Sequence, residues 1–73
     1  HFMKVDMSIV RNVHQDEHKR RLVDLLCSFA EATDSEVVAE GVETKEEAAA
    51  LADAGVDLMQ GYLYGEPSLT LTA

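Results

Sequence analysis

The sequence predicts an α/β fold in which short parallel strands alternate with helices. Two segments have helical periodicity and three have the length and composition of strands: residues 17–33 and 44–54, and residues 2–7, 36–41 and 57–60. The order is therefore strand, helix, strand, helix, strand. This order favours a parallel sheet with right-handed crossover connections.

A polar residue near the end of each predicted strand supports the same fold. Lys4, Glu40 and Gln60 each share an alternating face with an apolar neighbour. A barrel interior needs this arrangement if its lower layers are apolar and its upper layer carries the chemistry.

The composition limits the function classes. The chain has 73 residues, of which 47% are hydrophobic, and its formal net charge is −8. It is too short for a large catalytic core of its own. The negative charge argues against nucleic acid and against contact with an anionic membrane surface, because both need a basic field. A phosphate ester ligand would need a cation to mediate its binding.

The first predicted strand carries two charged residues on one face. Met3, Val5 and Met7 alternate with Phe2, Lys4 and Asp6. In a sheet with one wet face, Lys4 and Asp6 are simply solvated. In a sheet covered on both faces, they must point at something polar and become site residues.

Residues 8–16 have no sustained period and are interpreted as a connection with about one helical turn. The helix that follows has Asp16 as its N-cap and a stripe of six apolar residues: Leu22, Val23, Leu25, Leu26, Phe29 and Ala30. Lys19, Arg20 and Arg21 lie near its start, where the helix dipole disfavours cations. We interpret them as a solvated or partner-facing patch rather than as a phosphate site.

Three residues invite a functional interpretation that the sequence does not favour. His14 and His18 have zinc-ligand spacing, but Gln15 follows His14 where a metalloprotease has glutamate, and no cysteine pair lies nearby. Cys27 lies within an apolar helical pattern, which predicts a structural role. A single cysteine forms no internal disulfide, so we expect a cytoplasmic setting.

No apolar run has the length of a membrane span.

The segment from Val37 to Thr44 predicts a buried strand, an acidic turn and a helix start. Thr44 and Glu47 have capping-box spacing, and Gly55 is suited to end the helix. Catalytic groups of parallel α/β proteins commonly follow the carboxyl end of a strand. On spacing alone, two solvated glutamates explain the turn equally well. Residues 64–67 are interpreted as a loop.

Three motifs taken together resemble the C-terminal part of the EAL domain, the bacterial cyclic di-GMP phosphodiesterase family. They are Lys4-Val5-Asp6-Met7-Ser8, then Val38-Ala39-Glu40-Gly41-Val42-Glu43-Thr44, then Gln60-Gly61-Tyr62 with Gly65-x-Pro67. They occur in the order and spacing of the family. The resemblance covers about residues 2–67.

The resemblance implies a fold and an activity. Residues 1–73 would be the C-terminal fragment of a single EAL domain and would form the last three βα units of a TIM-like (β/α)8 barrel. This part is incomplete as a barrel on its own. The family hydrolyses cyclic di-GMP to linear pGpG in bacterial second-messenger signalling, using Mg²⁺ or Mn²⁺ in a two-metal site. Implied partners are cyclic di-GMP and either the rest of the barrel or a second copy of the chain.

The resemblance also implies residue roles. Lys4 resembles the lysine beside the nucleophilic water, and Glu40 resembles a metal ligand that binds directly or through water. Glu43 is similar to the glutamate that steadies the active-site loops. Gln60 is similar to the glutamine that orients water or phosphate, and Asp6 is a supporting candidate.

Two departures from the family pattern qualify the resemblance. The Glu-Ala-Leu motif and most of the family's metal ligands would lie upstream of His1, so the isolated chain is predicted to be inactive. Asp34 stands where the family commonly has a helix-ending glycine. The alternative function is a non-catalytic EAL-derived module that binds cyclic di-GMP or a protein partner.

Overall fold

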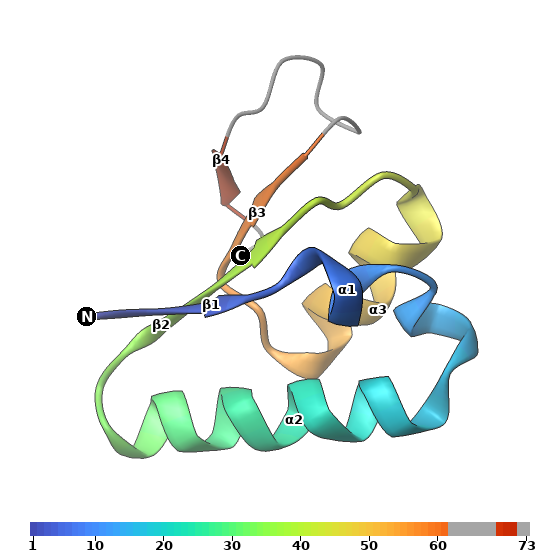
Figure 1. Ribbon diagram of the computed structural model, residues 1–73. Coiled ribbons are helices and arrows are strands. Elements are labelled where there is room, and N and C mark those ends of the chain that lie inside the picture. Colours follow the sequence, from blue (N-terminus) through green and yellow to red (C-terminus); the bar gives the residue numbers. More distant parts are fainter. Residues whose placement is uncertain (62–68, 72–73) are drawn as a thin grey trace.

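The computed structural model describes residues 1–61 and 69–71, and it shows a sheet with helices packed on it (Figure 1). The elements in chain order are β1 (Phe2–Val5), α1 (Met7–Val10), the 3-10 turn η1 (Val13–Gln15), α2 (Glu17–Ala32), β2 (Glu36–Glu40), α3 (Lys45–Ala54), β3 (Leu58–Gln60) and β4 (Leu69–Leu71). The predicted alternation of strands and helices is confirmed. The loop predicted at residues 64–67 lies outside the described residues.

The sheet has the order β1-β2-β3-β4. Strand β1 pairs with β2 in parallel, and β2 pairs with β3 in parallel, as the sequence predicts. Strand β4 was not predicted, and it pairs with β3 in antiparallel orientation. The α/β fold with three parallel strands is confirmed, with an antiparallel strand added at one edge.

The register separates the sheet into two faces. Val5 is paired with Ala39, which is paired with Met59, and all three side chains are buried. This row packs into the core with residues of the helices and connections, among them Val10, Val13, Val23, Ala30 and Leu51. The helices therefore cover this face. Because side chains alternate along a strand, the row that contains Lys4, Val38 and Leu58 lies on the opposite face.

The first strand is shorter than predicted. Strand β1 ends at Val5, and Asp6 instead caps the short helix α1. The Asp6 carboxylate accepts hydrogen bonds from the backbone N–H of Ser8 at 2.9 Å and from its hydroxyl at 2.6 Å. This local bonding competes successfully with the extended backbone that the alternating pattern favours.

The predicted helix ends are confirmed. Asp16 caps α2 by accepting from the backbone N–H groups of His18 and Lys19, and such a cap contributes about 1 kcal/mol. Thr44 and Glu47 form a complete capping box at the start of α3. Gly55 ends α3 with φ 107°, a conformation that favours glycine.

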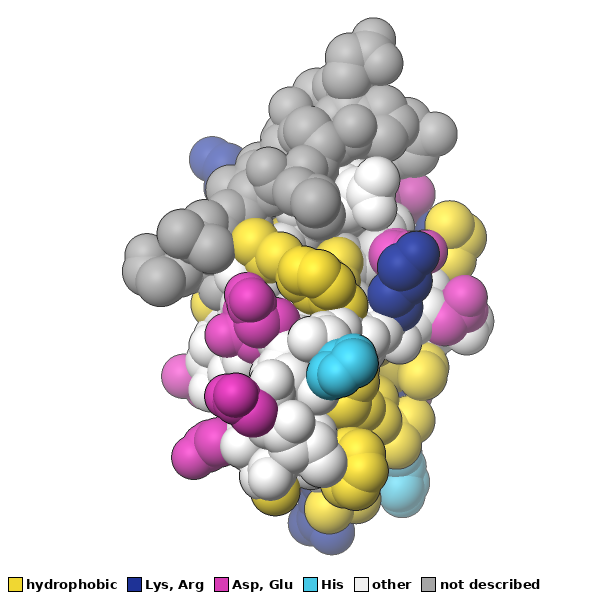
Figure 2. Space-filling view, turned by 90° about the vertical axis from the view of Figure 1, so that its left-hand side faces the viewer, with side chains coloured by type: hydrophobic (Ala, Val, Ile, Leu, Met, Phe, Trp, Pro, Cys, Tyr) yellow, Lys and Arg dark blue, Asp and Glu magenta, His cyan; other side chains and the backbone are white. Residues whose placement is uncertain are grey.

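The predicted apolar stripe of α2 is only partly buried. Val23 and Ala30 are in the core, whereas Leu22, Leu25 and Phe29 are 41%, 68% and 61% exposed. These three residues recur at helical spacing on a side of α2 that neither the sheet nor α3 covers. Figure 2 shows hydrophobic side chains at the surface of one face of the molecule, next to acidic ones. In the described part of the chain, no helix combines the length and apolar character needed to cross a membrane.

Candidate functional site

Three of the four predicted site residues lie at the carboxyl ends of the parallel strands, on the face away from the helices. Glu40 ends β2 and is paired in the sheet with Gln60, which ends β3. Lys4 is paired with Val38, two residues before Glu40 on the same face. The fold therefore gathers Lys4, Glu40 and Gln60, which are distant in sequence, at one end of one face.

Lys4 and Glu40 are in direct electrostatic contact. The Lys4 Nζ atom lies 3.7 Å from Glu40 Oε2, with the two side chains 72% and 32% exposed. An ion pair this open to water contributes about 1 kcal/mol or less to stability. The pair is thus a minor part of what holds the strands together. It places an ammonium group beside a carboxylate, a combination suited to binding a cation and an anionic ester together.

Glu43, three residues after Glu40, contacts a different segment of the chain. Its Oε2 atom lies 3.4 Å from Arg11 Nη2, and both side chains are partly exposed. Arg11 follows α1 and was not predicted to take part in the site. The structure thus places Glu43 against the connection that follows β1.

The buried carboxylate of Glu47 bonds to two segments of this region. Glu47 is 1% exposed, and it accepts hydrogen bonds from the backbone N–H groups of Asn12 at 2.9 Å, Glu43 at 3.0 Å and Thr44 at 3.3 Å. Burial alone would raise the pKa of the carboxyl. The three N–H donors and nearby His14 outweigh it and hold the pKa of Glu47 below its ordinary value.

The end of β3 is fixed to the turn after β2 by a close backbone approach. The Val42 N–H donates to the Gln60 carbonyl at 3.0 Å. A Cβ atom on Gly61 would lie 2.2 Å from the Val42 oxygen, so only glycine fits beside this backbone. The backbone at Gln60 and the Glu40–Thr44 turn are therefore held close together.

Asp6 has a structural contact. Hydrogen bonds from the Ser8 hydroxyl and then from the Ser8 backbone lower the pKa of Asp6, which is consistent with its capping role. The alternating pattern of β1 predicted that Asp6 would share the face of Lys4. The strand ends before Asp6, so that reasoning no longer applies to it.

The residues present fit part of a divalent metal site. Carboxylate oxygen is a ligand type that Mg²⁺ and Mn²⁺ prefer. Glu40 offers one carboxylate, on the face of the sheet away from the helices. Within residues 1–61 and 69–71, no three His, Cys, Asp or Glu side chains are gathered to hold a metal ion. Glu40 alone does not make a metal site, so a site at this position would need further ligands.

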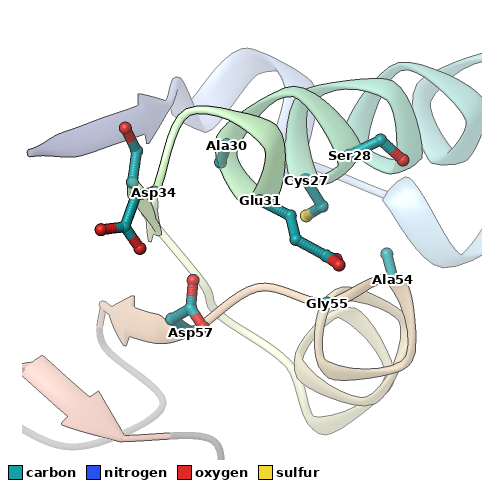
Figure 3. A pocket seen from close by; sticks show the side chains of 9 residues that line it. Cys27, Ser28, Ala30, Glu31, Asp34, Ala54, Gly55 and Asp57 are labelled. Atoms are coloured by element: carbon teal, nitrogen blue, oxygen red, sulfur yellow. The ribbon is translucent and has the colours of Figure 1, made fainter.

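A hollow at the opposite end of the sheet is not part of this candidate site. It measures about 320 Å³ and is lined by residues from the ends of α2 and α3 and from the segments that enter β2 and β3, including Cys27, Glu31, Asp34 and Asp57 (Figure 3). Partial burial raises the pKa of the Cys27 thiol, and the charges of Asp57 and Asp24 raise it further. These residues lie at the amino ends of the strands, away from Glu40.

Three contributors to the candidate site were missed from the sequence: Arg11, Asn12 and the second role of Glu47. The capping-box spacing indicated that Glu47 would bond the start of α3, and it does. No local pattern indicates a bond to Asn12, which is 35 residues away. The exposed pair of Arg11 with Glu43 also spans 32 residues.

Comparison with known proteins agrees with the motifs. The sequence profile of the EAL domain matches residues 1–67. The cyclic di-GMP phosphodiesterase PdeL of Escherichia coli strain K12 is 41% identical over 66 residues, which are 90% of this chain and 18% of PdeL. The chain thus spans less than a fifth of that relative.

Solved structures give the same result. BlrP1 of Klebsiella pneumoniae, in a complex with manganese and cyclic di-GMP, is 40% identical with a TM-score of 0.86, and the match covers 93% of this chain and 17% of BlrP1. The EAL enzyme Bd1971, with cAMP and cyclic di-GMP bound, is 39% identical with a TM-score of 0.84 over 90% of this chain and 18% of Bd1971. A family profile matched over nearly the full length, on a fold that superposes this well, shows that the chain belongs to the EAL domain family.

Proposed function

We propose that the chain is the C-terminal part of a single EAL domain that hydrolyses cyclic di-GMP to linear pGpG in bacterial second-messenger signalling. The observation that carries the proposal is the contact of Lys4 with Glu40 at the carboxyl ends of adjacent parallel strands, in register with Gln60. Relatives that match nearly all of this chain are cyclic di-GMP phosphodiesterases. In this proposal, Lys4 and Glu40 are catalytic residues, Glu43 supports catalysis by positioning the turn that begins at Glu40, and Gln60 binds substrate.

The charges of these residues suit the reaction. A phosphodiester and the hydroxide that attacks it are both anionic. The attack is therefore favoured when positive groups offset their charges. Two Mg²⁺ or Mn²⁺ ions would supply this offset and activate the water, with Glu40 as a ligand directly or through water. The Lys4 ammonium stabilises the negative charge that develops on the phosphate. Gln60 offers an amide that donates to a phosphate oxygen or orients water.

Glu43 acts through the loop in this proposal. Its carboxylate is 3.4 Å from Arg11, and its backbone N–H is bonded to Glu47. Glu43 thereby fixes the turn that begins at Glu40 against the connection that follows β1. A displacement of this turn would move the Glu40 carboxylate away from a cation bound there.

The remainder of the site requires other residues. Strand β1 lies at an edge of the sheet, and Leu22, Leu25 and Phe29 are exposed on α2. An edge strand beside an apolar helix face is suited to pairing with a further strand–helix unit. We propose that the preceding units of the (β/α)8 barrel cover both, with a second copy of the chain as the alternative occupant.

The single cysteine supports a cytoplasmic location.

A chimaera tests this function. Residues 1–67 replace the segment of PdeL that they match, and conversion of cyclic di-GMP to pGpG is measured with Mn²⁺ and with Mg²⁺. We expect metal-dependent turnover by the chimaera and none by the 73-residue chain alone. A chimaera that folds and binds cyclic di-GMP without hydrolysing it would instead favour the non-catalytic binding module.

Substitutions in the chimaera locate the activity. Glu40→Gln is expected to lower kcat about 100-fold or more, the scale seen when one electrostatic group of an active site is removed. The matched control is Glu36→Gln, because Glu36 is on the same strand and face but at its other end. Glu36→Gln should keep turnover near that of the unsubstituted chimaera. Equal losses in both variants would contradict the assignment of Glu40.

A further inference from the structure

Glu47 is a buried glutamate whose neighbour in the sequence, Glu46, is exposed. It follows Glu46 in the first turn of α3, and Glu46 is exposed, whereas Glu47 is 1% exposed. Burying a carboxylate is unfavourable unless hydrogen bonds replace its water. Glu47 has three such bonds, all from backbone N–H groups.

The two oxygens of the carboxylate serve two different segments. Oε2 accepts from Asn12, in the connection between α1 and η1, and Oε1 accepts from Glu43 and Thr44, in the turn after β2. Only a group that accepts through both oxygens can hold both segments. An ionised glutamate does so, whereas glutamine has one acceptor oxygen and a donor amide in place of the other.

A helix cap alone does not require this arrangement. The capping box needs only the Thr44 hydroxyl on the Glu47 N–H and the Glu47 carboxylate on the Thr44 N–H. The bond to Asn12 lies outside the box. Asn12 has φ 59°, a backbone conformation that asparagine adopts more readily than most residues.

The bonded segments flank the proposed catalytic turn. Arg11, the neighbour of Asn12, lies 3.4 Å from the Glu43 carboxylate. This second, more exposed contact joins the same two segments. Glu40 is anchored on one side by β2 and on the other by the bonds of Glu43 and Thr44 to Glu47. The turn is thereby fixed at both ends.

From this geometry we infer that Glu47 is a positioning residue, which sets the location of Glu40 and Glu43 by holding their turn against the Arg11–Asn12 segment. The inference rests on the proposed function for its effect on catalysis. Its structural part, the coupling of the two segments, does not depend on that function.

The test uses Glu47→Gln in the PdeL chimaera with two controls. Glu46→Gln makes the same charge change on the neighbouring exposed residue. Thr44→Ala removes the hydroxyl that caps α3 and leaves both oxygens of Glu47 able to accept. Hydrogen–deuterium exchange is measured by mass spectrometry on peptides that cover residues 11–16, 36–40 and 41–46. The Mn²⁺ concentration for half-maximal turnover is measured alongside it.

We expect hydrogen–deuterium exchange in Glu47→Gln to be about tenfold faster in one of the two bonded segments, residues 11–16 or residues 41–46. The single oxygen of glutamine can accept from only one segment, so the other loses its bond to a charged acceptor. Residues 36–40 should exchange as before. The half-saturating Mn²⁺ concentration should rise, with a lower kcat, beyond the effect in either control. Arg11→Gln, at an exposed position, should raise that concentration to a smaller extent.

Two results would overturn the inference. One is a Glu47→Gln variant that matches Thr44→Ala in exchange and in Mn²⁺ dependence, which would leave Glu47 as a helix cap only. The other is faster exchange in all three peptides alike. If the unsubstituted chimaera does not turn over substrate, the proposed function fails, and the exchange pattern still decides whether Glu47 couples the two segments.

Discussion

Gly61→Ala is expected to destabilise the domain and to disturb the candidate site. The new Cβ would lie 2.2 Å from the Val42 oxygen and 2.5 Å from its nitrogen, well inside any tolerated contact. Gly61 is buried, and the neighbouring atoms are backbone, so no flexible side chain can move aside. The chain at Gly61 and the chain at Val42 must therefore move apart.

The size of the effect follows from two contributions. Overpacking at a buried position costs about 1–3 kcal/mol. Loss of the bond from the Val42 N–H to the Gln60 carbonyl adds about 1 kcal/mol. A total of about 3 kcal/mol corresponds to a fall in Tm of about 6–12 °C for a domain of this family's size.

Thermal unfolding of the PdeL chimaera measures this effect, with Gly55→Ala as the control. A Cβ on Gly55 would meet the Cys27 side chain at 3.5 Å and 3.7 Å, which is ordinary packing, so only its φ of 107° makes alanine unfavourable. This conformation costs about 1–2 kcal/mol. If Gly61→Ala lowers Tm no more than Gly55→Ala does, the close approach at Val42 does not exist.

Three further predictions concern the fold. Asp34 has φ 57°, so Asp34→Gly should stabilise the chimaera by about 0.5–1 kcal/mol, measured by urea unfolding, and unchanged or lower stability would contradict the left-handed conformation. Because the folded-state pKa of Glu47 is below the ordinary 4.5, its carboxylate stabilises the fold above about pH 4.5, and this contribution is lost as the pH falls through the folded-state pKa. The Tm difference between the chimaera and its Glu47→Gln variant should therefore shrink below pH 4.5, and a constant difference would refute the coupling. Cys27 should react with a disulfide reagent at pH 8 more slowly than free cysteine does, and unfolding in urea should abolish the difference.

The sequence was sufficient where local chemistry decides the structure. The Thr44–Glu47 spacing and Gly55 located both ends of α3, and Asp16 located the start of α2, because these groups bond to backbone within their own turn. Alternation along the strands also placed Lys4, Glu40 and Gln60 on one face, and the register agrees.

Prediction was wrong or silent where distant segments or competing local bonds decide. The alternation of Phe2 to Met7 predicted a longer strand, but the bond of Asp6 to Ser8 turns the chain into α1. Leu22, Leu25 and Phe29 have the spacing of a buried stripe, yet in the described structure nothing covers them fully. The bond between Asn12 and Glu47 has no sequence signal, since it depends on how two connections meet.

The most direct test of the proposed metal site is the binding of Mn²⁺ to the PdeL chimaera, measured by calorimetry without cyclic di-GMP. Glu40 is the one carboxylate that the chain is proposed to supply to the metal ions, and it already lies beside Lys4. We expect Glu40→Gln to weaken Mn²⁺ binding about tenfold or more, and Glu36→Gln to leave it unchanged. Equal Mn²⁺ affinity in the unsubstituted chimaera and in Glu40→Gln would contradict the placement of a metal ion at this end of the sheet.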